Sequence, residues 1–100
     1  MMREWISFIH PPREDFAATM TDAENDAWAR HFERFEGALA DGTLILVGPT
    51  PGRINTGIAI FEVPDEPSAR RFMETDAAIA DGVATGELRP FRISLLRGRD

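Results

Sequence analysis

The sequence predicts an α+β domain with the ferredoxin-like element order β-α-β-β-α-β and a four-stranded antiparallel sheet. Three observations lead to this fold class: short apolar runs of strand length, one long stripe of helical period, and a second helical segment before a final apolar run. At 100 residues the chain is long enough for one hydrophobic core and too short for two. We therefore expect a single domain over residues 1–100.

The first strand is expected at residues 5–10. Ile6 and Phe8 alternate with Trp5 and Ile9, so both faces of this strand are apolar, which is typical of a strand buried on both sides. A proline pair at positions 11 and 12 ends the strand, because proline cannot donate a ladder hydrogen bond. Residues 13–15 are interpreted as a polar loop.

The first helix has the clearest signals in the chain. Thr21 and Glu24 match the S/T-x-x-E capping box at its start, and Gly42 ends it because glycine readily takes the left-handed conformation. The predicted buried stripe, at helical spacing, consists of Trp28, Phe32, Phe35 and Leu39. The charged residues expected on the opposite side are Asp26, Arg30 and Glu33.

The second half of the chain supplies the remaining elements. Residues 43–47 are an apolar run interpreted as a buried strand, residues 48–52 a loop, and residues 56–63 a third strand that pairs with the second as a hairpin. The segment 64–67 opens a second helix, residues 77–80 add a further helical turn, and Gly82 stops it. The last strand is expected at residues 88–96.

The predicted sheet has one face that its helices do not cover. Because the first three strands are apolar on both faces, a lone chain would expose an apolar patch of several hundred Å², which monomers rarely tolerate. We therefore expect a homodimer, a dimeric α+β barrel in which two sheets pack face to face.

Composition excludes several classes of function. Cysteine, lysine and tyrosine are absent, which removes disulfides, thiolate ligands, Schiff-base lysines and phenolic acids. A net charge of −6, and a third strand without stacking aromatic residues, argue against nucleic-acid binding. No run approaches the roughly 18 apolar residues of a membrane span, and no signal peptide is recognised, so a cytoplasmic location is expected.

Metal and cofactor motifs are not found in the sequence. The two histidines lack a metal-binding spacing, and the glycine-rich segment 48–57 matches neither phosphate-binding motif. We expect no metal ion, no cofactor and no nucleic-acid or membrane partner.

Five polar residues are candidates for a functional site. His31 borders the helical stripe and is either a satisfied core-edge residue or a general acid/base. Asp76 is either the N-cap of the short helical turn or the carboxylate that orients His31. His10 either ends the first strand or lines a cleft, and Arg53 and Asn55 at the hairpin end suit an anionic or carbonyl substrate.

The chain resembles the YCII-related (YciI-like) family along nearly its whole length. The segments that carry the resemblance are the apolar first strand, His31 within Trp28-Ala29-Arg30-His31-Phe32, Leu46-Val47-Gly48-Pro49, and Asp76 before Ala80-Asp81-Gly82-Val83. The resemblance implies a dimeric α+β barrel and a catalytic His/Asp pair, which corresponds to His31 and Asp76. Gly48 and Pro49 match the Gly-Pro turn of the family. Family members often have Asp-Pro where this chain has Asp76-Ala77.

The resulting functional prediction is a cofactor-free enzyme that acts on a small metabolite. His31 is the acid/base and Asp76 its orienting partner, in chemistry of the isomerase, lyase or hydrolase type. The expected substrate contacts are His10, Gly48, Pro49, Arg53 and Asn55. The alternative is a dimeric module that binds a small ligand or assists another protein without turnover.

Overall fold

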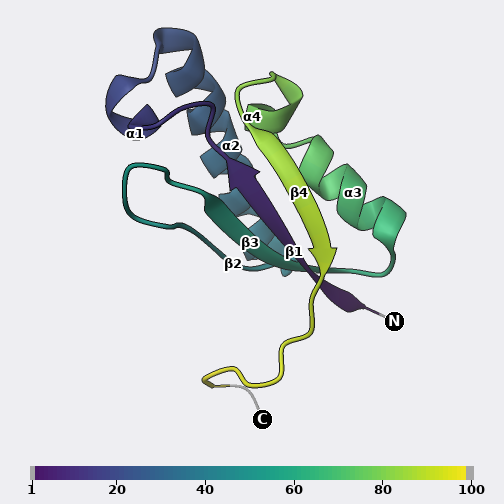
Figure 1. The fold of residues 1–100 in the computed structure, drawn as a ribbon. Helices are drawn as coiled ribbons and strands as arrows, with labels where there is room; N and C mark the ends of the chain where they lie inside the picture. Colours follow the sequence, from purple (N-terminus) through teal and green to yellow (C-terminus); the bar gives the residue numbers. More distant parts are fainter. Residues whose placement is uncertain (1, 99–100) are drawn as a thin grey trace.

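The computed structural model describes residues 2–98, which form four strands and four helices (Figure 1). The elements, in chain order, are β1 (Arg3–His10), α1 (Phe16–Thr19), α2 (Asp22–Asp41), β2 (Leu44–Pro49), β3 (Gly57–Val63), α3 (Glu66–Glu74), α4 (Ala77–Ala80) and β4 (Thr85–Pro90).

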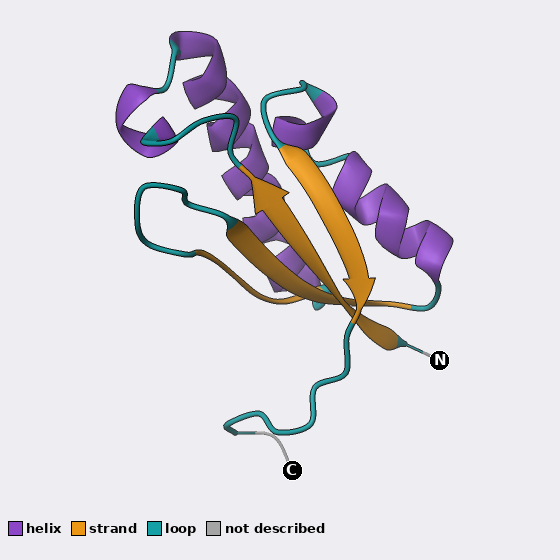
Figure 2. Ribbon diagram, in the orientation of Figure 1, coloured by secondary structure: helices purple, strands orange, loops and turns teal. Residues whose placement is uncertain are grey.

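The four strands form one sheet in the order β2-β3-β1-β4, and every neighbouring pair is antiparallel. The helices lie on one side of this sheet (Figure 2). Strand order and element order together confirm the predicted α+β, ferredoxin-like fold. The hairpin predicted between the second and third strands is also present as the β2–β3 pair.

The core lies between the helices and the two central strands. Trp5, Ser7 and Ile9 of β1 are buried, and their register partners Ala59 and Phe61 on β3 are fully covered. The alternate residues of β1 are only half-buried and lie on the other face of the sheet, which the helices leave open. The predicted alternation of this strand is therefore present, but the expectation that it is buried on both sides is wrong for the lone chain, because the helices cover only one face.

Helix α2 begins and ends as predicted but buries a different set of residues. Both hydrogen bonds of the capping box at Thr21 are formed, and Gly42 takes the left-handed conformation with φ of 90°. However, Phe32 and Leu39 are more than half exposed. Of the predicted stripe, Phe35 is buried and Trp28 is half-buried against the core, and the other buried residues of the helix are Ala27, His31 and Ala38. The two alanines occupy the contact line, which lets the helix approach the sheet closely and turns His31 inward.

A β-bulge in β2 changes which of its side chains face the helices. Leu44 is opposite Phe61, but the register shifts before Leu46, which is opposite Ile60, and Val47 is then opposite Ala59. The extra residue switches the alternation, so Val47 turns to the helix side and Leu46 to the open face. The prediction of a buried strand here is wrong for the lone chain, because β2 is a sheet edge and both Leu46 and Val47 are exposed.

Two further boundaries differ from the prediction. Residues 16–19 form the short helix α1, which anchors the buried Phe16 directly after the predicted loop. The last strand is β4 at Thr85–Pro90 rather than residues 88–96, because Pro90 ends the ladder with β1. Beyond it, the backbone N–H of Phe91 donates to the carbonyl oxygen of Glu4, and that of Ile93 donates to the Glu4 carboxylate.

Glu24 links stability to pH at the start of α2. Hydrogen bonds from Arg13, followed by the bond from the Thr21 backbone, lower the pKa of Glu24 from 4.5 to about 2. A lowered pKa in the folded state means that the stabilisation is complete above pH 4.5 and is lost as the pH falls toward 2. We predict that Glu24→Gln lowers the free energy of unfolding at pH 6 and that this difference shrinks at pH 3, measured by urea denaturation.

The matched control for this prediction is Glu36→Gln on the same helix. Glu36 is exposed, and within residues 2–98 no hydrogen bond or ion pair is formed by its side chain. A difference between the wild type and Glu24→Gln that stays constant from pH 6 to pH 3 contradicts the assignment.

Candidate active site

His31 and Asp76 meet in the interior although they belong to different halves of the chain. The Nδ1 atom of His31 lies 2.7 Å from Oδ1 and 2.8 Å from Oδ2 of Asp76. His31 is 6% exposed and Asp76 1% exposed. Such a buried polar pair is stable only because each group satisfies the other.

Asp76 combines the two roles that the sequence left as alternatives. It is the N-cap of α4, where its Oδ2 accepts a hydrogen bond from the backbone of Ala78 at 3.1 Å, and it also accepts from His31. A carboxylate that accepts the Nδ1–H of a neutral imidazole leaves the lone pair on Nε2. The contact therefore selects the tautomer in which Nε2 can take up a proton.

Two arginines beside His31 hold α2 against the same corner of the fold. Arg30 bonds Asp81, and this bond, followed by the one to Asp26, raises the pKa of the Arg30 guanidinium. Arg34 donates to the hydroxyl of Thr75 at 2.8 Å. Together with the bond between His31 and Asp76, these contacts tie α2 to the segment 75–81.

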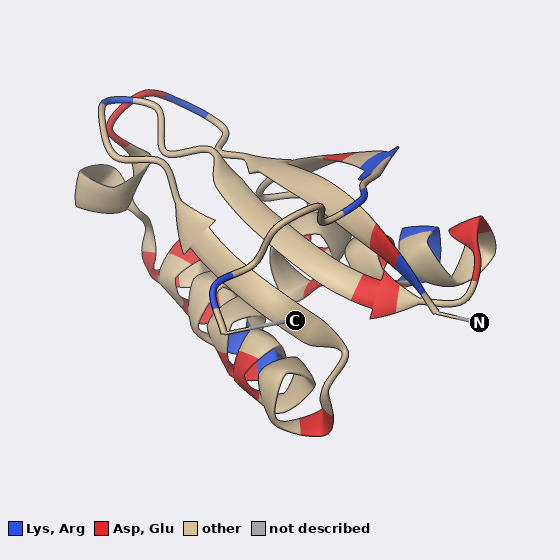
Figure 3. Cartoon of the chain, turned by 90° about the horizontal axis from the view of Figure 1, so that it is seen from below, with Lys and Arg blue, Asp and Glu red and all other residues tan. Residues whose placement is uncertain are grey.

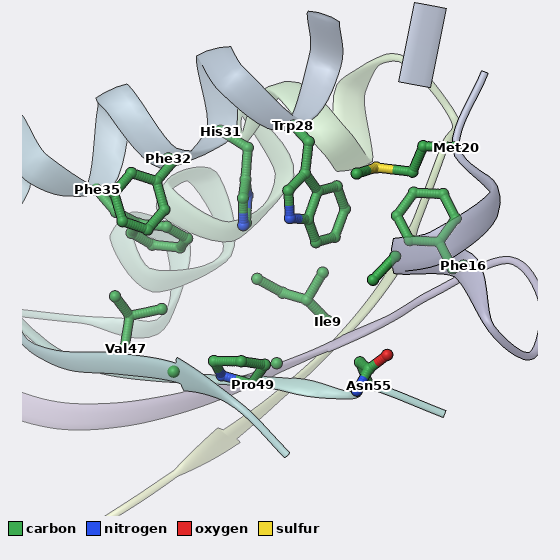
Figure 4. Close-up of a pocket in the computed structure, with 13 residues that line it drawn as sticks. Ile9, Phe16, Met20, Trp28, His31, Phe32, Phe35, Val47, Pro49 and Asn55 are labelled. Atoms are coloured by element: carbon green, nitrogen blue, oxygen red, sulfur yellow. The ribbon is translucent and has the colours of Figure 1, made fainter. Parts of the chain in front are cut away.

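A cavity of about 310 Å³ opens beside His31, between α1, α2 and the β2–β3 hairpin. The imidazole points into it from α2 and is flanked by Trp28 and Phe35, whose ring centroids lie 4.5 and 4.8 Å from its own (Figure 4). The volume is at the lower end of the range of small-molecule sites. The lining residues are almost all apolar: Ile9, Phe16, Ala17, Met20, Trp28, His31, Phe32, Phe35, Val47, Gly48, Pro49, Asn55 and Gly57.

The predicted substrate contacts divide into two groups. Gly48, Pro49 and Asn55 line the cavity. Arg53 does not, because its side chain is mostly exposed and pairs with Glu14 at 2.7 Å. His10 is also outside the cavity: it lies at the end of β1, stacked on Phe8 and 3.4 Å from both Thr56 Oγ1 and Glu87 Oε1.

Sequence reasoning assigned three of the four aromatic residues of the cavity to the buried stripe that His31 borders, and it missed the fourth. Trp28 was expected in the buried stripe, yet its position three residues before His31 on a helix already places the two side by side. Phe16 gave no signal, because the short helix that carries it has no periodicity to detect.

The distribution of charged residues and of potential metal ligands indicates no further site among residues 2–98. Acidic and basic segments are interspersed along the chain in the view of Figure 3. Among residues 2–98, no three His, Cys, Asp or Glu side chains gather as a metal site would require. In the same part of the chain, none of the helices has the length and apolar character needed to cross a membrane.

The fold and the buried His/Asp pair beside a small apolar cavity define a small α+β domain of the ferredoxin-like class with one candidate site. The chain belongs to the YCII-related domain family, whose model matches residues 6–92. This confirms the resemblance seen in the sequence.

A solved structure with a similar fold is 5-chloro-2-hydroxyhydroquinone dehydrochlorinase from Burkholderia phenoliruptrix, in complex with 2,5-dihydroxybenzoquinone. The two chains are 17% identical, with a TM-score of 0.62 over 87% of this chain and 93% of that one. At this identity the similarity concerns the fold. None of the curated proteins compared with the sequence matches it.

The geometry predicts the tautomer of His31. In the wild type with a neutral ring, we expect Nδ1 of His31 to carry the proton and Nε2 to be unprotonated, measured by long-range ¹H–¹⁵N NMR of the imidazoles. In Asp76→Ala this preference should disappear, and stability should fall by about 1.5–3 kcal/mol, as for the loss of a hydrogen bond to a charged group. His10 is the internal reference and should not change. A wild-type His31 protonated on Nε2 alone contradicts the assignment.

Proposed function

We propose that this protein is an acid/base enzyme that transfers a proton on a small carbonyl-bearing ring compound, with His31 as the catalytic base and Asp76 as its orienting partner. The observation that carries the proposal is the buried bond between Asp76 and His31 Nδ1 at the wall of an otherwise apolar cavity. An imidazole held in one orientation, with its other nitrogen toward a ligand, is the arrangement of a general base.

The proposed step is the removal of a proton from a carbon next to the carbonyl group. Nε2 of His31 takes the proton, and the electron pair of the C–H bond passes into the enolate. The imidazolium, stabilised by Asp76, then returns the proton to another carbon, as in an isomerase, or the enolate expels a leaving group, as in a lyase. No oxidant or reductant is needed, and the apolar walls exclude water from the intermediate.

Two observations support a ring as the substrate. The cavity is walled by aromatic side chains on the helix side and by Val47, Gly48 and Pro49 of β2 opposite, which suits a planar molecule (Figure 4). The dehydrochlorinase of similar fold is complexed with 2,5-dihydroxybenzoquinone, a ring with carbonyl and hydroxyl groups. By analogy we assign the same general class of ligand to this chain.

A minimal assay tests the proton transfer without the natural substrate. Conversion of cyclohex-3-enone to the conjugated cyclohex-2-enone removes a proton next to a carbonyl and returns it two carbons further on, and is followed by ultraviolet absorbance. We predict that His31→Gln lowers the protein-catalysed rate by about 10²–10⁴-fold, the usual contribution of a general base, while affinity for the product is unchanged. Glu36→Gln, exposed on the same helix, should keep the wild-type rate.

The competing function is a binding module without turnover. It predicts that cyclohex-2-enone binds in the cavity and that the wild type does not accelerate the isomerisation over buffer. A rate that is equal in the wild type and in His31→Gln overturns the catalytic role of His31. Loss of folding in both His31→Gln and Asp76→Ala, together with no acceleration by the wild type, favours a purely structural pair.

We also propose that the assembly is a homodimer formed through the open face of the sheet. This face carries an apolar group at its centre, namely Ile6, Phe8, Leu46, Ile58 and Ile60, with Arg89 and Glu87 opposite Ile6 and Phe8 on β4. The occupant we favour is a second copy, because a patch with one acid and one base at its side is complementary to itself across a twofold axis.

The dimer is tested by a charge at the centre of the open face. We predict that the wild type has a molar mass of twice 11.2 kDa in sedimentation equilibrium and that Ile60→Lys has the mass of one chain. Arg70→Lys, on the exposed side of α3, is the control and should keep the wild-type mass. A wild type that sediments as a monomer contradicts the proposal.

A further inference from the structure

The cavity beside His31 contains very few polar side chains. Of its lining residues only Trp28, His31 and Asn55 carry a side-chain nitrogen or oxygen, and these come from α2 and from the segment between β2 and β3. Because the remaining walls are apolar, each polar atom that faces the cavity has a strong effect on which ligands can enter.

Asn55 presents an acceptor to the cavity. Its Nδ2 donates to the carbonyl oxygens of Thr50 at 3.0 Å and Gly52 at 2.9 Å, which uses both N–H groups and fixes the orientation of the amide. The side-chain oxygen therefore points away from those carbonyls, on the side of Phe16 (Figure 4). Among residues 2–98, no protein donor bonds this oxygen, so it is available to a ligand.

The loop that carries Asn55 is itself held in place. Thr50 bonds the carbonyl oxygen of Thr56 twice, from its backbone N–H at 2.8 Å and from its hydroxyl at 2.9 Å. Asp15 donates its backbone N–H to the carbonyl oxygen of Arg53 at 2.7 Å, which ties the loop to the start of α1. The acceptor is thus positioned before a ligand arrives, and little ordering cost is left for binding.

Trp28 presents a donor to the same cavity. Its indole nitrogen lies on the His31 side of the ring (Figure 4), and within the described residues its N–H has no protein acceptor. The other tryptophan of the chain differs, because Trp5 donates its Nε1–H to the carbonyl oxygen of Val63 at 3.3 Å. An indole N–H placed beside the proposed base can bond the carbonyl oxygen of a ligand whose neighbouring carbon faces His31.

We propose that Trp28 Nε1–H and Asn55 Oδ1 determine ligand specificity, and that the ligand is a planar ring with a carbonyl oxygen bonded by Trp28 and a hydroxyl group bonded by Asn55. The inference uses the cavity of the proposed function but does not require turnover. A ligand that lacks the carbonyl oxygen leaves the indole N–H of Trp28 unpaired, and one that lacks the hydroxyl group leaves Oδ1 of Asn55 unpaired. Each missing group lowers the affinity roughly 10-fold.

Wild-type protein and a set of simple ring compounds test both assignments by ¹H–¹⁵N NMR. Acetophenone should shift the indole N–H signal of Trp28 downfield, ethylbenzene should not, and the signal of Trp5 should stay in place as the internal reference. Of 2-, 3- and 4-hydroxyacetophenone, at least one should bind about 10-fold more tightly than its own methyl ether. Equal shifts with acetophenone and ethylbenzene, or no shift with either at millimolar concentration, overturn the role of Trp28.

Two variants assign each preference to its residue. Trp28→Phe keeps an aromatic wall and should bind acetophenone and ethylbenzene equally well. Asn55→Leu should bind the hydroxyacetophenones no more tightly than the methyl ethers, while the ethers bind as they do to the wild type. A hydroxyl preference that persists in Asn55→Leu, or that is missing from all three isomers in the wild type, overturns the role of Asn55.

The outcome is separable from that of the proposed catalysis. A wild type that shows both preferences but does not isomerise cyclohex-3-enone refutes the base role of His31 and leaves the ligand assignment intact. A wild type that isomerises the enone through His31 but shows neither preference refutes the ligand assignment alone.

Discussion

The bond between His31 and Asp76 is the constraint on which the candidate site depends. It joins the middle of the long helix α2 to the corner between α3 and α4, and it is buried, so neither group can exchange its partner for water. Because Asp76 also caps α4, the same carboxylate fixes the local backbone and the imidazole. Folding of the chain therefore also fixes the orientation of the His31 ring.

The contacts on either side of the pair hold this corner of the fold in place. Arg30 precedes and Arg34 follows His31 along α2. Arg30 bonds Asp81 and Arg34 bonds Thr75, so the segment around Asp76 is attached to α2 at three residues. The opposite wall of the cavity is held by the hydrogen bonds of the β2–β3 loop. The cavity therefore lies between two walls that are each held by hydrogen bonds, with mostly apolar side chains facing it.

The sequence alone predicted the position of those elements whose ends or alternation are set by local signals. The capping box at Thr21 and the glycine at position 42 located α2, and alternation located β1. Prediction failed where tertiary packing decides: the buried line of α2 runs through two alanines and His31 rather than through Phe32 and Leu39, because close approach to the sheet favours small residues there. The meeting of His31 with Asp76 was an expectation that spacing alone had no means to test, since it depends on how the two halves of the fold pack together.

The bulge in β2 determines which side chains of that strand face the cavity. One inserted residue is what turns Val47 toward the cavity and carries Pro49 along the same wall. A relative that lacked this insertion would turn the neighbouring side chains toward the cavity even with every cavity residue retained in its sequence. The lining of the cavity can thus change by gain or loss of a single edge-strand residue, without any substitution among the residues that form it.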